Sequence, residues 1–163
     1  MKTLNDYIAV YKEQLQKGDI QKAYAGLLRY MMSLKAHFSN KLSDSFSFGN
    51  ISAGYMDYTY FPFFNDELRE KKLRFGIVLN HEEVRFELWL MGQNAEVQKN
   101  YWNLLKLSPW NKTRTTMPEY SVLEVALIES PDFTDLNSLS LKIEKETLSF
   151  LKEIIGYLKA INT

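Results

Sequence analysis

Alternating apolar and polar positions are clearest in the middle third of the chain. Apolar residues occupy every second position from Leu73 to Leu79, and after a polar segment at 80–83 the alternation resumes from Val84 to Leu90. A period of two is typical of β-strands with one buried face, so the two runs predict a β-hairpin. An isolated hairpin is only marginally stable in water. We therefore expect further strands or helices to cover its apolar face.

Helical spacing dominates both ends of the chain. Apolar residues recur at steps of three and four from Leu4 to Leu15 and again from Ile20 to Phe38, with only Lys17, Gly18 and Asp19 near the junction. This spacing predicts two helices, and a join this short predicts an αα-hairpin. A third apolar stripe predicts a long C-terminal helix, and its members are Leu136, Leu139, Ile143, Leu148, Leu151, Ile154, Ile155, Leu158 and Ile161.

Shorter segments complete the pattern. Residues 40–53 are expected to form a loop with room for a short edge strand, and residues 54–64 a strand. Residues 65–72 are expected to form one or two helical turns capped by Asn65. Residues 109–120 are expected to form a long loop and residues 121–128 a strand, with a helix as the alternative for 121–128. Asn94 can cap a middle helix whose expected buried side is Val97, Tyr101, Leu104 and Leu105, with Trp102 as a possible extension.

Together these elements predict an α+β fold in one domain over residues 1–163. The sheet is expected to have about four mainly antiparallel strands around the central hairpin. An N-terminal αα-hairpin, a middle helix and a long C-terminal helix would pack mainly on one face of that sheet.

Composition narrows the function classes. The chain has no cysteine, which excludes a disulfide framework, a thiolate nucleophile and cysteine-based metal sites and fits a cytoplasmic protein. Its 20 basic and 20 acidic residues cancel, so no global positive field is available and nucleic acid is not the expected partner. No segment has the apolar length of a membrane span or a signal peptide. No cofactor or metal motif is present, and GxSxG, Walker, GxGxxG and HExxH patterns are absent.

Several local motifs resemble one known family as a set. They are GDIQKAY at 18–24, GYMDYTYF at 54–61, RFELWL at 85–90, VQKNYW at 97–102, WNK at 110–112 and PDFTDL at 131–136. The chain is similar along nearly its whole length to stand-alone bacterial proteins of about its own length that carry a domain-of-unknown-function label. The resemblance implies a bacterial, cytoplasmic protein and assigns no activity, cofactor or site.

The face of the hairpin opposite the expected helices supplies the first candidate site. Arg74, Arg85, Glu87 and Trp89 alternate with the apolar positions and therefore share this face, with Tyr58 and Tyr60 of the neighbouring strand beside them. Such a surface suits recognition of a small molecule or a protein. The simpler interpretation is a solvated sheet face on which charges pair across strands.

The 109–120 loop supplies the second candidate site. Lys112 and Arg114, flanked by Trp110, can grip a phosphate or carboxylate. Trp110 can equally serve as the hydrophobic anchor of a long loop.

The alternative function is a divergent metal-dependent nuclease or hydrolase of the PD(D/E)xK kind. Asp57 and Glu87 lie on different predicted strands, and two carboxylates suit a hard divalent cation. However, Trp89 occupies the position of the lysine that such a motif requires. Pairing of Glu87 with Arg85 or Arg74 is the simpler interpretation.

The two histidines add little chemistry to these candidates. His81 is expected to be an exposed turn residue, and His37 to meet the dipole or a carbonyl at its helix end. The function therefore stays unknown at this level, and the sequence does not decide whether the chain is an enzyme. The favoured hypothesis is a cytoplasmic binding or interaction domain that uses the aromatic and charged sheet face together with the 109–120 loop.

Overall fold

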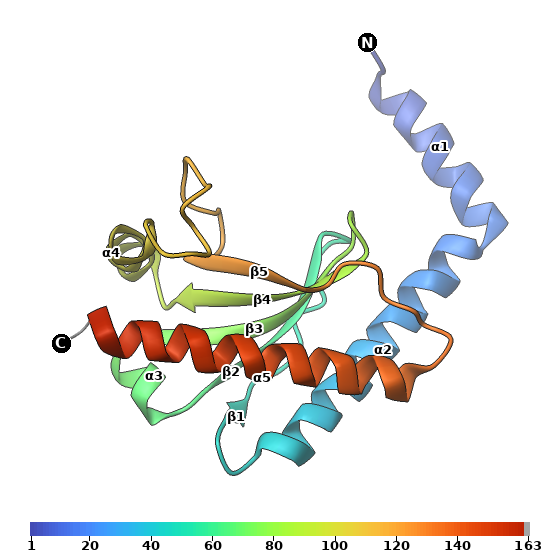
Figure 1. The fold of residues 1–163 in the computed structure, drawn as a ribbon. Coiled ribbons are helices and arrows are strands. Elements are labelled where there is room, and N and C mark those ends of the chain that lie inside the picture. The colour runs from blue at the N-terminus through green and yellow to red at the C-terminus, as the bar shows by residue number, and fades with distance from the viewer. Residues whose placement is uncertain (162–163) are drawn as a thin grey trace.

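A computed structural model describes residues 1–161 of the chain (Figure 1). The elements are α1 (Leu4–Lys17), α2 (Asp19–Leu42), β1 (Ser47–Phe48), β2 (Tyr58–Phe64), α3 (Asp66–Glu70), β3 (Leu73–Asn80), β4 (Arg85–Gly92), α4 (Ala95–Leu105), β5 (Leu123–Ile128) and α5 (Leu136–Ile161). The predicted α+β class is confirmed. The sheet has five strands rather than about four, because the 40–53 segment contributes the two-residue edge strand β1.

The strands form one antiparallel sheet in the order β1-β2-β3-β4-β5, so each strand pairs with its neighbour along the chain. The predicted hairpin is β3 and β4, in which Phe75 lies opposite Leu90 and Ile77 opposite Leu88. Val84, expected to begin the second strand, instead lies exposed in the turn with a positive φ of 49°. Residues 121–128 contain the strand β5 and not a helix.

The apolar face of the sheet is the core of the molecule. Phe75, Ile77 and Leu88 are fully buried there, and they pack in one cluster with residues of α2 and α5. Figure 1 shows α5 running along this face of the sheet, with α2 crossing near its end. Because α2 and α5 pack on this face, the opposite face is left for a site.

The N-terminal helices form the predicted pair, but only α2 covers the sheet. Helix α1 buries no residue, and Figure 1 shows it leading away from the sheet. Gly18, with a φ of 81°, ends α1 and begins α2. Its left-handed conformation breaks the helix and redirects the chain.

Three leucines assigned to buried helix faces are exposed: Leu104, Leu136 and Leu148. On α4, Val97, Tyr101 and Leu105 follow one another at steps of four along the covered side, and Trp102 packs beside them. Leu104 lies one residue, about 100°, away from that line. On α5, the buried position next to Leu148 belongs to Thr147, whose hydroxyl donates to the Ile143 carbonyl at 2.7 Å. Within residues 1–161, none of the helices combines the length and hydropathy needed to cross a bilayer.

Candidate functional site

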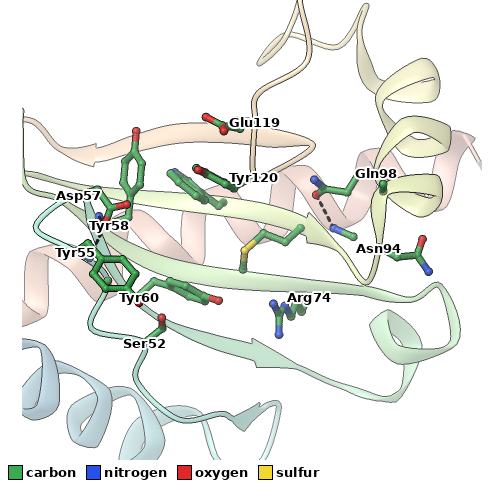
Figure 2. A pocket seen from close by; sticks show the side chains of 15 residues that line it. Ser52, Tyr55, Asp57, Tyr58, Tyr60, Arg74, Asn94, Gln98, Glu119 and Tyr120 are labelled. Carbon is green, nitrogen blue, oxygen red and sulfur yellow. Dashed lines mark hydrogen bonds between the residues drawn. The ribbon is translucent and has the colours of Figure 1, made fainter.

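The open face of the sheet holds a pocket of about 540 Å³ (Figure 2). Its floor comes from three strands, because every second residue of β2, β3 and β4 points away from the helices. The 52–57 segment, residues 119–120 and the start of α4 form its walls. We call it the sheet-face pocket.

The floor is a small apolar cluster separate from the main core. Val78, Trp89 and Met91 form it, and Tyr58 and Tyr60 pack against them. The rings of Tyr58 and Trp89 meet edge to face, with centroids 4.8 Å apart. Aromatic pairs in this geometry add to the free energy of area burial and fix ring orientation. The floor is therefore fixed in shape, and its accessible aromatic surface belongs to the half-buried Tyr58 and Tyr60, because Trp89 is only 3% exposed.

Gly76 lies directly opposite Trp89 across the β3–β4 ladder and is buried under the floor side chains. A Cβ at this position would lie 2.7 Å from the Cε of Met91 and 3.6 Å from the Cδ2 of Tyr60. The absence of a side chain at Gly76 therefore lets Met91 pack down onto β3 as part of the floor. Arg74 lies two residues before Gly76 on the same face, about 7 Å along the strand.

A buried carboxylate on the same sheet face fixes the position of the Trp89 ring. Glu87 is only 2% exposed, and its Oε1 accepts a hydrogen bond from the Trp89 indole N–H at 2.8 Å. Its Oε2 accepts from Asn80 Nδ2 at 3.0 Å and from Arg85 Nε at 2.6 Å. The Glu87 hydrogen bond raises the pKa of Arg85 above its usual value. Three donors thus satisfy the buried carboxylate, and rotation of the indole ring would remove the Trp89 donor from Oε1.

One end of the pocket is acidic and rich in tyrosine. The carboxylate of Asp57 accepts hydrogen bonds from the backbone N–H groups of Tyr55 and Tyr58, which hold the pKa of Asp57 below its usual range. A hydrogen bond with Glu119 raises the pKa of the Tyr120 hydroxyl. The Tyr120 ring lies 6.4 Å from that of Tyr58.

The other end is cationic. Arg74 is exposed and lies well apart from Asp57 and Glu119 in Figure 2. Within residues 1–161 its guanidinium makes no ion pair with an acid. Asn94 and Gln98 of α4 line the same end, where Gln98 Oε1 accepts a 2.9 Å hydrogen bond from the Gly92 N–H. The pocket therefore offers an uncompensated positive charge beside an aromatic floor.

Only half of the residues predicted to bind a ligand line the sheet-face pocket. Tyr58, Tyr60, Arg74 and Trp89 line the pocket, whereas Arg85, Trp110, Lys112 and Arg114 do not. Trp110 instead packs edge to face on Tyr157 of α5 at 5.5 Å, as a loop anchor would, and Arg114 pairs with Glu124 at 3.3 Å. Lys112 is exposed outside the pocket.

Several pocket residues were not predicted. The 109–120 loop contributes Glu119 and Tyr120 rather than its basic residues. Met91 follows Trp89 at the strand period of two, so the alternation along β4 also predicts that Met91 lies on this face. Glu124, opposite Trp89 on β5, also lies on this face, and burial raises the pKa of its carboxyl. No short-range pattern indicated Asn94 and Gln98, because their position depends on how α4 packs.

Asp57 and Glu87 do not form an obvious metal pair. Asp57 lies just before β2 rather than on a strand, and Glu87 lies on β4; β3 separates β2 from β4, so two strand spacings, roughly 10 Å, lie between the two residues. Both carboxylates already accept hydrogen bonds from protein donors. Among residues 1–161, no group of three or more histidines and acids is arranged to hold a metal ion. The hydrolase hypothesis stays a prediction, and the site geometry adds nothing to it.

Both histidines lie in environments different from those expected. His81 is half-buried rather than exposed: its Nε2 lies 2.8 Å from Thr59 Oγ1, and its ring is 5.6 Å from that of Tyr24. Thr59 donates its single hydroxyl proton to the Ala53 carbonyl, so Nε2 must be the donor in the other contact. His37 does not meet its own helix end, because its Nε2 lies 3.0 Å from Glu144 Oε1 on α5.

These features define an α+β protein with a helix-covered sheet and a polarised pocket on the open face. The chain belongs to the family described as Domain of unknown function (DUF7000), whose family model matches residues 4–158. The resemblance found in the local motifs is thereby confirmed at the level of the family label. No curated protein and no solved structure matches the chain.

Proposed function

We propose that this chain is a binding module whose sheet-face pocket takes a small ligand with an apolar or aromatic body and an anionic group. One observation carries the proposal. Within residues 1–161 the guanidinium of Arg74 makes no ion pair with an acid, and it lines the same pocket as the aromatic floor. A planar or apolar ligand body would cover the accessible parts of Tyr58 and Tyr60 above Trp89, and its anion would meet Arg74.

The magnitudes support such a ligand. Covering the apolar parts of the pocket contributes roughly 0.8 kcal/mol for each buried CH₂-sized group. A charge-assisted hydrogen bond to Arg74 contributes about 1.5–3 kcal/mol. Because these contributions total only a few kcal/mol and the ligand also loses freedom on binding, the expected affinity is weak, in about the millimolar range or weaker. A volume of about 540 Å³ is within the usual size of small-molecule sites.

The remaining features of the chain support a metabolite partner in the cytoplasm. The absence of cysteine fits a reducing compartment, and the balanced charges give no general attraction for nucleic acid. A protein segment is the other candidate partner. The pocket volume of about 540 Å³ favours a small molecule, because it is the size of a small-molecule site.

Thermal-shift measurements with two matched probes test the proposal. 3-Phenylpropionate carries the anion, and 3-phenylpropanol lacks it. We expect only the carboxylate to raise the Tm of the wild-type protein and of Arg29→Gln, a charge-matched control on the exposed side of α2. Arg74→Gln should remove the rise. Equal responses of Arg74→Gln and Arg29→Gln, or equal responses to both probes, would overturn the proposal.

A further inference from the structure

A second hollow of about 320 Å³ adjoins the cationic end of the sheet-face pocket. It is lined by Phe64, Arg69, Lys72, Leu73, Arg74 and Gln93. Three of these six residues are cations and none is an acid, although the chain as a whole has equal numbers of each. We call it the basic hollow.

We propose that the basic hollow is a subsite for a phosphate-type polyanion, which makes the ligand of the sheet-face pocket a phosphorylated compound. The inference rests on the proposed function, because Arg74 lines both hollows. An anionic group held by Arg74 at the edge of the aromatic floor would continue directly into the basic hollow.

The backbone ties two of the cations together. The Lys72 N–H donates to the Arg69 carbonyl at 2.9 Å, and the Lys72 carbonyl accepts from the Gln93 N–H at 2.9 Å. Lys72 has a positive φ of 58°, a backbone conformation that residues other than glycine and asparagine rarely adopt. This conformation costs free energy, and it places Lys72 at the junction of α3 and β3 beside the other two cations.

Arg69 is oriented by an aromatic side chain. Its guanidinium carbon lies 4.4 Å from the ring centroid of Phe64, which also lines the hollow. When a guanidinium lies over the face of an aromatic ring, its N–H groups remain free to donate hydrogen bonds to an anion. The guanidinium is therefore positioned before any ligand arrives.

Electrostatics favour a ligand with more than one negative charge. Within the part of the chain that the structure describes, Arg69, Lys72 and Arg74 make no ion pair with an acid. Like charges gathered around one hollow repel each other, and a polyanion converts this repulsion into attraction. A single carboxylate would neutralise only one of the three cations. A phosphate or diphosphate group matches them better, and guanidinium groups bind phosphate bidentately.

Pyrophosphate is the probe that tests this subsite without an aromatic body. Isothermal titration at low ionic strength should show binding to the wild-type protein that weakens as salt is added. Arg69→Gln and Lys72→Gln should each weaken it about tenfold, the effect of losing one charge-assisted hydrogen bond. Lys72→Asn is the second variant at that position, because asparagine tolerates a positive φ.

Lys71→Gln is the matched control. Lys71 is the neighbour of Lys72 and carries the same charge, but it lines a different hollow, beside Asn65 and Leu158. Its substitution should change pyrophosphate affinity by less than about twofold, since only the general field changes. Absence of pyrophosphate binding, or equal losses in Lys71→Gln and the Lys72 variants, would overturn the inference. Inorganic phosphate and phenyl phosphate distinguish a free phosphate ligand from a phosphorylated organic one.

The two proposals fail in different ways. If 3-phenylpropionate binds through Arg74 but pyrophosphate does not bind, the phosphate subsite is wrong and the sheet-face pocket stands. If pyrophosphate binds and 3-phenylpropionate gives no Arg74-dependent response, the proposed function is wrong. A phosphorylated ligand requires both responses, and Lys72→Gln should then lose pyrophosphate while keeping 3-phenylpropionate.

Discussion

The indole N–H of Trp89 donates a 2.8 Å hydrogen bond to the carboxylate of Glu87, two residues earlier on the same strand face. Trp89 itself is 3% exposed, so most of its ring is covered by neighbouring side chains. The buried charge thus sets the angle of the ring that forms the pocket floor. This link joins the stability of the sheet to the shape of the site.

Glu87→Gln should destabilise the protein by about 1–3 kcal/mol. The glutamine amide has only one acceptor oxygen, whereas Glu87 accepts from three donors. The NH₂ group of the glutamine would then face at least one of these donors and leave it without an acceptor. Urea unfolding measures the loss. Glu153→Gln on the exposed side of α5 is the control and should be neutral. A Glu87→Gln protein as stable as the wild type would mean that the network contributes nothing.

The unfolding free energy should fall as the pH drops through about 6.5 because of His81. Burial lowers the pKa of His81 below its ordinary value of 6.5, and the charge of Asp57 opposes this only in part. The unfolded chain therefore takes up the proton first, so acid favours unfolding and stability rises with pH in this window.

The comparison is made by denaturant unfolding at pH 7.5 and 5.5. His81→Gln should lose less stability than the wild type between the two pH values, whereas His37→Gln tests the other histidine of the chain. If the unfolding free energy of His81→Gln changes as much between the two pH values as that of the wild type, His81 does not cause the pH dependence.

Gly54 and Gly156 should respond in opposite directions to alanine. Gly54 has a φ of 72°, and an added Cβ would collide with the Tyr58 carbonyl oxygen, so Gly54→Ala should cost about 1–2 kcal/mol and disturb the pocket wall. Gly156 lies in α5 with nothing within 4 Å of an added Cβ. Gly156→Ala should stabilise the protein by about 0.5–1 kcal/mol. Thermal unfolding of both variants checks the contrast.

Removal of residues 1–17 should leave the fold intact. Helix α1 buries no residue, so its deletion should move the Tm by no more than about 2 °C. By contrast, Phe38→Ala in α2 removes a fully buried ring and should cost about 3–5 kcal/mol. A large loss of Tm in the truncated protein would show that α1 contributes to the core.

Local patterns predicted the elements well because each of them buries one face. The hairpin, the helix caps at Asn65 and Asn94, and strand β5 follow from periodicity and capping chemistry that a few neighbouring residues determine. The same patterns could not show that α1 is left uncovered. An amphipathic stripe reports that a helix can pack, and only the tertiary structure decides whether it does.

The site was predictable to the extent that it follows from strand alternation. The period of two placed Tyr58, Tyr60, Arg74 and Trp89 on one face. Arg85 shares that face, but pairing with Glu87 occupies it. The walls depend on how the 52–57 and 119–120 segments and α4 pack around the sheet. Such long-range packing has no signature within one stretch of sequence.

A heteronuclear NMR titration with 3-phenylpropionate tests the sheet-face pocket most directly. The three tryptophan indole signals provide an internal comparison, because Trp89 lies on the pocket floor while Trp102 and Trp110 pack against the main core. Trp89→Phe assigns the Trp89 signal. We predict that the Trp89 indole signal shifts on titration, that the other two stay in place, and that Arg74→Gln suppresses the shift. Movement of the Trp102 or Trp110 signal with Trp89 unchanged would contradict the account.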